Sequence, residues 1–421
     1  MKPITQEIAD KNVDYIVDGI TEVIKTFGPR DPGSEGETKA NEHFAKVLTQ
    51  YADDVKTEKF TLHTDAFMGW IYFDIFFMYI GIISIWLNLN ILSIALVVAC
   101  IVLLVLQLIF YKHVTAPFFA KKTSTNVYAA KKPTGTVKRR IIFCGHTDAA
   151  YEWGWLYKGG FGLFFATFIG AFIAMILVVV MAIIGIAKHG WAVQLLTPEL
   201  LGNTYFYVQL CLSIVSVILI SLMFNFSNKS TIVDGANDNL TACLTSISVL
   251  KTMQDENIVF ENTEVCALMA GSEEAGLRGA MAFSKAHKAE LDKDAANGIE
   301  TIFIVLETLR EKDCLSIYNK DMNGVVPADP QVCKLLKIAA KEAINKDLHY
   351  STVSLGSTDA AAFSNAGLKS ACFAALNHKL QRYYHTRMDT YTNLSKETLD
   401  LAYKVCMKTL EIYDKDGLPE A

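Results

Sequence analysis

The sequence predicts an α/β domain with a mixed, largely parallel central sheet and helices on both faces, interrupted by two transmembrane helical hairpins. Helix-forming segments alternate with short apolar runs, as in strands joined by crossover helices. Four longer apolar stretches divide this pattern, and each has the roughly 20 residues that a helix needs to cross a bilayer. The domain is therefore expected in three pieces, at residues 1–66, 112–159 and 227–421, with hairpins at 67–111 and 160–226.

Composition limits the class of protein. Of the 421 residues, 52% are hydrophobic and 20% are charged, so the chain is too apolar for an ordinary soluble enzyme and too charged for a pure membrane bundle. The net charge is −5 and there is no basic stripe, which argues against nucleic acid as a partner. Nine cysteines stand singly, and we expect buried, reduced thiols rather than disulfides or a zinc ribbon.

The first piece of the domain is expected to contain two helices and an edge strand. Apolar residues recur at helical spacing over residues 3–27 and 36–52, and VKTEKFTL at 55–62 is typical of an edge strand. Because the first 66 residues are polar and amphipathic, no signal peptide is expected.

The four apolar stretches are expected to be membrane spans. They cover residues 67–87 and 91–111 in the first hairpin, and 160–187 and 205–224 in the second. Aromatic residues mark their ends, as in interfacial belts. Asp74 is an acidic outlier inside the first span: either it is functional or, lying near one end of its helix, it reaches the headgroups.

Charge around the spans predicts their orientation. An even number of crossings returns the three polar pieces to one side of the membrane. Several lysines lie close to the spans on that side, whereas the opposite loops carry only Lys188. The positive-inside bias therefore predicts a cytoplasmic domain, and the reduced cysteines agree with that compartment. The lipid bilayer is an expected partner, and the sequence leaves the oligomeric state open.

The later pieces supply the rest of the sheet. Strands are expected at 125–132 and 138–146 around the turn KPTG. Helices and strands then alternate: helix 236–255, strand 264–271, helix 277–291, strand 299–309, helix 331–344, strand 370–376 and helix 396–413. In such a sheet, ligands bind at the carboxyl ends of the strands.

Side chains with metal-binding or proton-transfer chemistry collect at those strand ends. They are His146, Asp148, Asp238, Glu273, Glu274, Glu307 and His385. Two histidines and four carboxylates suit two zinc ions bridged by one carboxylate with a water between them, and Asp148 can orient His146. Of the adjacent Glu273 and Glu274, one could hold a metal while the other faces a water. Taken alone, however, such a pair is more often a solvated helix N-terminus.

Six motifs resemble one family in order. They are PRDPGSEGETKANEHFAKVL, GHTDAA, DGANDNLTA, AGSEEAGLRGA, STDAAAFSNAGL and YYHTRMDT. Together they resemble the co-catalytic zinc aminopeptidases of metallopeptidase family 28, a group that includes aminopeptidase Y and bacterial leucyl aminopeptidases and has glutamate carboxypeptidases and glutaminyl cyclases as relatives. The resemblance covers essentially the whole polar part of the chain and implies the zinc exopeptidase fold.

The resemblance also implies a role for each site residue. Asp238 would bridge two zinc ions, and the remaining ligands would be His146 and Glu307 at one ion, Glu274 and His385 at the other. Glu273 would be the general base, Asp148 would orient His146, and Tyr384 would stabilise the oxyanion. The peptide bond between Asp238 and Asn239 would be cis.

Two departures from the family matter. Its aminopeptidases commonly have aspartate where Glu307 stands, so the second zinc is expected to be weakly held or displaced. If Glu307 is only a strand residue, Asp313 is the alternative ligand. The membrane pairs also interrupt the domain where ordinary members have short connections, which implies a hydrolase built into the membrane.

Several function classes follow. The leading one is an integral-membrane zinc metallo-exopeptidase, an aminopeptidase that hydrolyses N-terminal residues of short peptides with Glu273 as base. A second is an amidase or cyclase acting on acylated or amphipathic amino-acid amides. A catalytically inactive membrane receptor or scaffold and a transporter-like protein are the non-enzymatic alternatives. We further hypothesise that the zinc centre opens toward the membrane.

Overall fold

The computed structural model describes residues 3–420 and divides into two compact units. The sheet unit comprises the described residues up to Thr64, Lys121–Tyr151, and those from Thr231 onward. The helical unit comprises Asp65–Ala120 and Glu152–Ser230. Two short strands, β4 (Tyr151–Glu152) and β5 (Asn228–Ile232), stand where the chain passes between the units.

The sheet unit is built on a nine-stranded mixed sheet, which confirms the predicted fold class. Its strands, in spatial order, are β1 (Asp54–Leu62), β2 (Lys122–Lys131), β6 (Thr263–Ala270), β3 (Arg139–His146), β7 (Glu300–Leu309), β11 (Lys369–Ala375), β8 (Ser316–Asp321) and β10 (Tyr350–Thr352), and β9 (Val326–Pro327) pairs with β8. The central strands β6, β3, β7 and β11 run parallel. Strand β1 pairs antiparallel with β2 at one edge, as its sequence predicts.

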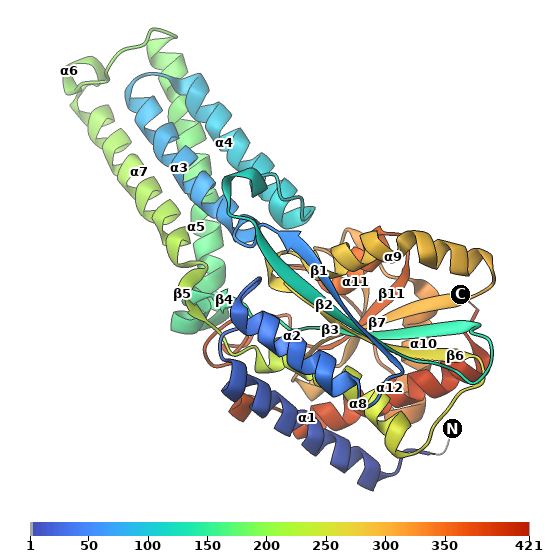
Figure 1. The fold of residues 1–421 in the computed structure, drawn as a ribbon. Helices are drawn as coiled ribbons and strands as arrows, with labels where there is room; N and C mark the ends of the chain where they lie inside the picture. The colour runs from blue at the N-terminus through green and yellow to red at the C-terminus, as the bar shows by residue number, and fades with distance from the viewer. Residues whose placement is uncertain (1–2, 421) are drawn as a thin grey trace. The chain divides into compact units, whose positions relative to one another are not determined.

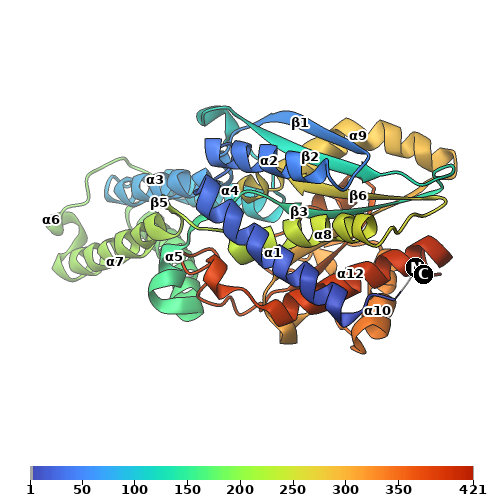
Figure 2. The same ribbon diagram turned by 60° about the horizontal axis from the view of Figure 1, so that its bottom comes forward.

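Helices cover both faces of the sheet (Figures 1 and 2). One face carries α1 (Gln6–Phe27), α2 (Glu35–Leu48), α8 (Thr241–Asp255), α10 (Pro330–Ile344) and α12 (Lys396–Asp416). The other carries α9 (Arg278–Ala296) and α11 (Asp359–Asn365). The main hydrophobic core lies between the first group and the sheet.

Helix α1 shows how the sequence forms this layer. Thr5 caps it by accepting a hydrogen bond from the Ile8 amide, and Gly28 ends it with a φ of 64° that favours glycine. Apolar side chains three or four residues apart, among them Val13, Ile16 and Ile20, are buried on one face. Burying such a side chain stabilises the fold by about 1.5–3 kcal/mol.

Strand β3 is buried along its last six residues, as expected of a central parallel strand covered on both faces. Its neighbours β6 and β7 run in the same direction, so the carboxyl ends of all three lie side by side. The sheet therefore gathers at one edge the residues that follow these strands.

The sequence does not predict the short elements. Strands β4, β5, β8, β9 and β10 and helix α11 have between two and seven residues, too few to show a periodicity. The expected helix 236–255 begins with a π-helical turn, Ala236–Leu240, before α8. Within this turn the peptide bond from Asp238 to Asn239 is cis, which agrees with the implied geometry. Short 3-10 turns occupy Glu273–Ala275, Lys312–Cys314 and Tyr391–Asn393.

The helical unit contains four helices long and apolar enough to cross a membrane. They are α3 (Ala66–Trp86), α4 (Asn90–Leu104, continued by the π-turn Val105–Ile109), α5 (Gly154–His189, kinked at Gly160) and α7 (Asn203–Ser221, continued by the 3-10 turn Leu222–Asn225). The short α6 (Pro198–Leu201) and a 3-10 turn at Ala116–Phe118 complete the unit.

The structure bears on the two alternatives for Asp74. Its side chain is only 3% exposed and lines a cavity inside the helical unit, which disfavours the alternative that it reaches outward to the headgroups. Seven of the nine cysteines are buried, as expected, whereas Cys211 is exposed and Cys314 is half-buried.

Candidate metal centre

The candidate site forms where β6, β3 and β7 end. His146 is the last residue of β3, and Glu307 lies two residues before the end of β7. Glu273 and Glu274 follow β6 after a sharp turn in which Ser272 has a φ of 54°. Asp238 comes from the turn before α8, and His385 from the loop between β11 and α12.

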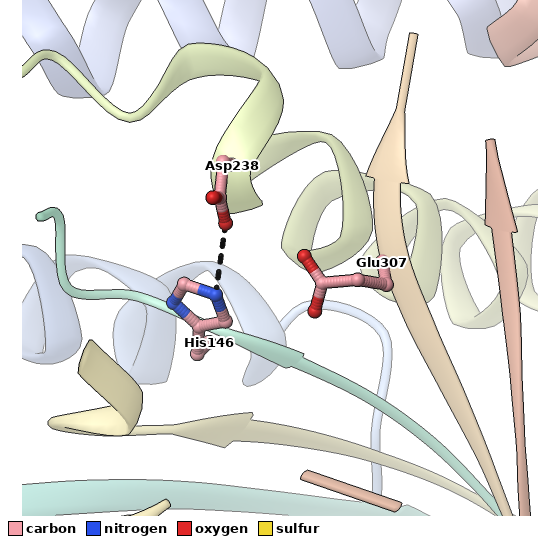
Figure 3. A group of neighbouring side chains, drawn as sticks. All are labelled: His146, Asp238 and Glu307. Atoms are coloured by element: carbon pink, nitrogen blue, oxygen red, sulfur yellow. Dashed lines mark hydrogen bonds and ion pairs between the residues drawn. The ribbon is translucent and has the colours of Figure 1, made fainter. Parts of the chain in front are cut away.

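His146, Asp238 and Glu307 point into one space (Figure 3). His146 Nε2 is 3.1 Å from Asp238 Oδ1, and each of the three residues offers a ligand atom within 4.8 Å of the others. This is the first predicted ligand group. All three side chains are buried.

Asp238 also faces the second predicted group. Its other oxygen, Oδ2, is 2.9 Å from His385 Nε2, which is 3.2 Å from Glu274 Oε1. Each oxygen of Asp238 therefore faces one histidine, as a carboxylate that bridges two ions would. Glu273 lies beside this pair, with its Oε2 3.8 Å from His146 Nε2.

Asp148 organises both sides of the site. Its Oδ1 is 3.3 Å from His146 Nδ1, as expected of a residue that orients the ring. Its two oxygens also accept the backbone amides of Glu273 and Glu274, each at 2.9 Å. The same buried carboxylate thus fixes the histidine and the glutamate turn.

The charges of the site are not balanced by the protein alone. Burial raises the pKa of Glu273, Glu274 and Glu307 well above the usual range, and neighbouring carboxylates add to the effect.

His146 and Asp238, in contrast, keep their charges. Burial alone would lower the pKa of His146, but the carboxylates of Glu273 and Asp148 raise it well above its usual value. Burial likewise opposes ionisation of Asp238, yet its contacts with the two histidines hold its pKa below the usual range. A buried group of four carboxylates (Asp238, Glu273, Glu274 and Glu307) needs cations beside it.

The residues fit zinc. Imidazole nitrogens and carboxylate oxygens are ligands that zinc prefers together. The buried oxygens Asp238 Oδ2 and Glu274 Oε1 face the same nitrogen, His385 Nε2, at 2.9 and 3.2 Å, and one ring nitrogen carries at most one proton to donate, so the ring alone does not satisfy both oxygens. A metal ion among these groups would satisfy both.

Glu307, rather than Asp313, belongs to the site. Its two oxygens accept hydrogen bonds from Asn239 Nδ2 at 3.0 Å and Thr308 Oγ1 at 2.8 Å, which aim the carboxylate. Asp313 is exposed in the turn Lys312–Cys314 and joins none of the ligand groups among the described residues.

Tyr384 lies against the second ligand group. Its ring stacks on His385, with centroids 4.1 Å apart. Burial, followed by the charges of Asp238 and Glu274, raises the pKa of its hydroxyl well above the usual range. The hydroxyl therefore stays protonated and can donate a hydrogen bond.

Two aspartates at the site carry no role in the sequence-based prediction. Asp389 accepts the backbone amides of Asn237 and Asp238, at 2.9 and 3.1 Å, and thereby fixes the turn that presents Asp238. Asp359 is 1% exposed, and no described residue hydrogen-bonds its carboxyl. Burial, reinforced by Asp148, raises the pKa of Asp359 to about 7. Both lie inside motifs that carry the family resemblance, which is the signal that could have identified them.

Two further residues support the site from the first motif. Glu37 is fully buried and accepts hydrogen bonds from the backbone and hydroxyl of Ser272, at 2.6 and 2.9 Å. It thereby fixes the residue before Glu273. The fully buried Arg30 donates to the carbonyl oxygens of Thr147 and Asp234, and so ties together the segments after His146 and before Asp238.

One segment of the chain matches a known family. Residues 223–410 match Peptidase family M28. The matched segment covers a little under half of the chain, supports a metallopeptidase, and includes every predicted site residue except His146 and Asp148. The structure adds these two from strand β3 and the residues after it. No curated protein matches the chain by sequence.

Solved structures share the fold at low identity. A zinc aminopeptidase from Bacillus subtilis superposes with a TM-score of 0.55 at 12% identity, covering 94% of both chains. A glutaminyl cyclase from Fimbriiglobus ruber gives 0.54 at 13% identity and 95% of both chains. LapB from Legionella pneumophila gives 0.54 at 11% identity, covering 98% of this chain and 77% of its own.

Proposed function

We propose that this metallopeptidase is an integral-membrane aminopeptidase that removes N-terminal residues from short peptides. The observation that carries the proposal is the geometry of Asp238, whose two oxygens face His146 and His385 with Glu273 alongside. Asp238 would hold two zinc ions jointly, with His146 and Glu307 at one and Glu274 and His385 at the other. When bound, zinc supplies a Lewis acid that polarises the scissile carbonyl and makes water nucleophilic at neutral pH.

Glu273 is the proton carrier of the proposed reaction. Its carboxylate takes a proton from water as the water oxygen attacks the carbonyl carbon. It then gives the proton to the peptide nitrogen as the carbon–nitrogen bond breaks. Asp148 supports this role, because its hydrogen bond to the Glu273 amide fixes where that backbone lies.

Tyr384 is the proposed donor to the oxygen of the scissile carbonyl. A protonated hydroxyl near the ligand carboxylates can donate to the oxygen that gains negative charge as water adds. Asp148 and Asp389 hold His146 and Asp238 respectively, so the main groups are in place before substrate binds.

We place the protein in a membrane through its helical unit. Four helices of sufficient length and apolarity support this placement, and exposed side chains such as Phe76, Ile176 and Ile218 suit contact with lipid. The lysines near the spans favour a cytoplasmic sheet unit. Short peptides and the bilayer are the proposed partners.

An amidase or cyclase acting on amino-acid amides is the second candidate. The glutaminyl cyclase superposes on this chain about as well as the zinc aminopeptidase does, with TM-scores of 0.54 and 0.55. The unpartnered carboxyl of Asp359 also offers a proton acceptor beyond those that hydrolysis requires. An inactive receptor or scaffold is less consistent with the protein, because the residues proposed as ligands and as base lie within reach of one another.

A paired assay tests the proposal. Zinc-loaded, full-length protein is incubated with leucyl peptides that carry either a free or an acetylated N-terminal amine, and the released amino acid is measured. The aminopeptidase hydrolyses only the free-amine peptide. Equal release from both, or release from the acetylated peptide alone, would replace this proposal with the amidase.

A further inference from the structure

The loop that carries His385 is long and irregular. It covers residues 376–395, between β11 and α12, and it includes the 3-10 turn Tyr391–Asn393. Loops of this length in a compact domain are usually functional. His385 itself has a φ of 48°, a region that residues other than glycine seldom adopt and keep only where surrounding contacts enforce it. The position of this proposed ligand therefore depends on what holds the loop.

Two residues that follow β7 hold the loop at three points. The main-chain amide of Glu311 donates to the Ala375 carbonyl at 2.8 Å, and Glu311 Oε2 accepts the Tyr383 hydroxyl at 2.6 Å. Arg310 donates from Nε to the Asn393 carbonyl at 2.7 Å and from Nη2 to Asn393 Oδ1 at 2.9 Å. The start, the middle and the end of the loop are therefore attached to two consecutive residues.

The attachment at Tyr383 is the one nearest to the metal centre. Tyr383 is 6% exposed, and the guanidinium carbon of Arg310 lies 5.9 Å from the centroid of its ring. A hydrogen bond to a carboxylate is stronger than one between neutral groups, and burial of the hydroxyl limits competition from water. The next two residues in the chain are Tyr384 and His385. A displacement of Tyr383 would therefore move both the proposed oxyanion donor and a proposed ligand.

The same segment also carries a ligand of the other group. Glu307 lies three and four residues before Arg310 and Glu311 on one continuous stretch of chain. Thr308, between them, has a φ of 41°, which is unusual for a β-branched residue, and its hydroxyl donates to Glu307 Oε1 at 2.8 Å. Such conformations are typical of functional sites. Residues 307–311 thus present one proposed ligand and hold the loop that presents another.

A second attachment lies on the other side of His385. Asp389, in the same loop, accepts the backbone amides of Asn237 and Asp238. His385 therefore lies between Tyr383, which is held from β7, and Asp389, which is held from the turn before α8. Both attachments act on the loop from residues that precede it by more than 60 positions in the sequence.

We propose that Glu311 is a positioning residue which, by holding Tyr383, keeps His385 in place and so sets the affinity for the zinc ion that His385 would help to hold. Arg310 supports it by fixing the end of the same loop, and Tyr384 is placed by the same contacts. The inference rests on the proposed function, because it concerns one of the two zinc ions proposed there. Glu311 acts through its neighbours and is not itself a proposed ligand.

Zinc binding by the full-length protein tests the proposal. The protein is dialysed to equilibrium against buffered free zinc, and bound metal is measured by inductively coupled plasma mass spectrometry. The parent should bind two ions in two steps. Tyr383→Phe should shift one step to free zinc concentrations about 10- to 100-fold higher, the loss typical when a group that orients a metal ligand is removed, and should leave the other step unchanged.

Two reference variants identify the affected step. His385→Ala removes the ligand itself and should abolish the step that Tyr383→Phe shifts. Tyr350→Phe, at a side chain on β10 that is 41% exposed, is the matched control and should change neither step. A Tyr383→Phe variant in which both steps shift equally, or in which neither shifts, would overturn the proposal.

Variants of Glu311 separate the hydrogen bond from packing. Glu311→Gln should retain most of the zinc affinity, because its amide oxygen still accepts from Tyr383, whereas Glu311→Ala should weaken the same step as Tyr383→Phe does. Adding Tyr383→Phe to Glu311→Ala should cost little more than Glu311→Ala alone, since both remove one shared hydrogen bond. Fully additive losses would show that the two residues act independently and would contradict the proposal.

Peptide hydrolysis distinguishes this inference from the proposed function. At saturating zinc, Tyr383→Phe should lower kcat while KM stays near the parent value, because Tyr384 would act only as the carbonyl oxygen gains charge. A parent protein that binds two zinc ions, with the expected shift in Tyr383→Phe, but hydrolyses no peptide would support the positioning role and contradict the aminopeptidase. An active parent with unchanged zinc binding in Tyr383→Phe would contradict the positioning role alone.

Discussion

Asp148 shows how single residues determine the geometry of the site. It contacts the ring of His146 and accepts the amides of Glu273 and Glu274, so one carboxylate aligns groups from two neighbouring strands. The sequence predicts its contact with His146, which is two residues away. The contacts with the glutamates, 125 and 126 residues away, arise only because β3 and β6 are adjacent.

Residues that follow strand ends could be predicted because chemistry and position coincide there. Asp359, Asp389, Glu37 and Arg30 could not be assigned in this way. Glu37, for example, acts on Ser272 from 235 residues away, and nothing near it in the sequence indicates that contact.

Glu273→Gln tests the general base. The amide cannot accept the proton of water, so we expect turnover to fall by about 10²- to 10⁴-fold or more. Zinc content should stay at the parent value, because Glu273 is not a proposed ligand. Glu290→Gln, on the exposed side of α9, serves as control. Peptide hydrolysis at the parent rate by the Gln variant would exclude Glu273 as the base.

Glu37→Gln tests support of the catalytic turn. The Glu37 carboxylate accepts hydrogen bonds from four donors, which are the Gly33 amide, the Ser124 hydroxyl, and the amide and hydroxyl of Ser272. An amide group would place a donor against one of these donors. We expect a loss of about 1–3 kcal/mol in the free energy of unfolding. We also expect kcat to fall more than KM changes, since Glu273 follows Ser272. Glu35→Gln, exposed at the start of the same helix, should have neither effect; a Glu37 variant with the parent kcat would mean that its role is only structural.

At the scale of elements, the length of a strand or helix determines whether it can be predicted from the sequence. Strands such as β3 and β7 and helices such as α1 and α12 are long enough for their periodicity to be read, and they form as expected. The three residues of β10 and the seven of α11 carry no such pattern. Their structure depends instead on tertiary partners, such as β8 for β10.

The contact between edge strand β1 and helix α9 should depend on pH. His287 Nε2 is 2.7 Å from Glu58 Oε1, and this hydrogen bond outweighs burial and raises the pKa of His287. A raised histidine pKa contributes stability that is complete below the unfolded value of about 6.5 and is lost as pH rises through the folded value.

Glu58→Gln measures that contribution. We expect it to lower stability by about 0.2–1 kcal/mol below pH 6 and by much less at pH 9, as judged from thermal unfolding at both pH values. An equal loss at the two pH values would show that charge on His287 is not involved.

At the scale of the whole molecule, a different sequence pattern predicts each of the two units. Alternating strands and helices predict the sheet unit, and uninterrupted apolar length predicts the four helices of the other. Both signals come from local patterns. Membrane orientation and the route of substrate to the metal centre depend on the surroundings of the protein, and they stay predictions.

Metal removal should destabilise the sheet unit specifically. Without added cations, the buried Glu274 and Glu307 lie close to Asp238, and His146 offsets only part of the repulsion, since the pKa of both glutamates stays raised. At a zinc concentration 100 times the dissociation constant, binding adds about 2.7 kcal/mol. A chelator should therefore lower the unfolding temperature, and added zinc should restore it. Asp238→Ala should abolish this response; a response that persists in that variant would locate the stabilising metal elsewhere.

Following the oxygen atom of water gives the most direct test of a water-using aminopeptidase. Zinc-loaded protein is incubated in ¹⁸O-labelled water with a short peptide that begins with glutamine, and the products are identified by mass spectrometry. We predict free glutamine with ¹⁸O in its α-carboxyl group, together with the peptide shortened by one residue. A pyroglutamyl peptide with ammonia and no ¹⁸O would instead identify a cyclase, and unchanged peptide would contradict an exopeptidase at this centre.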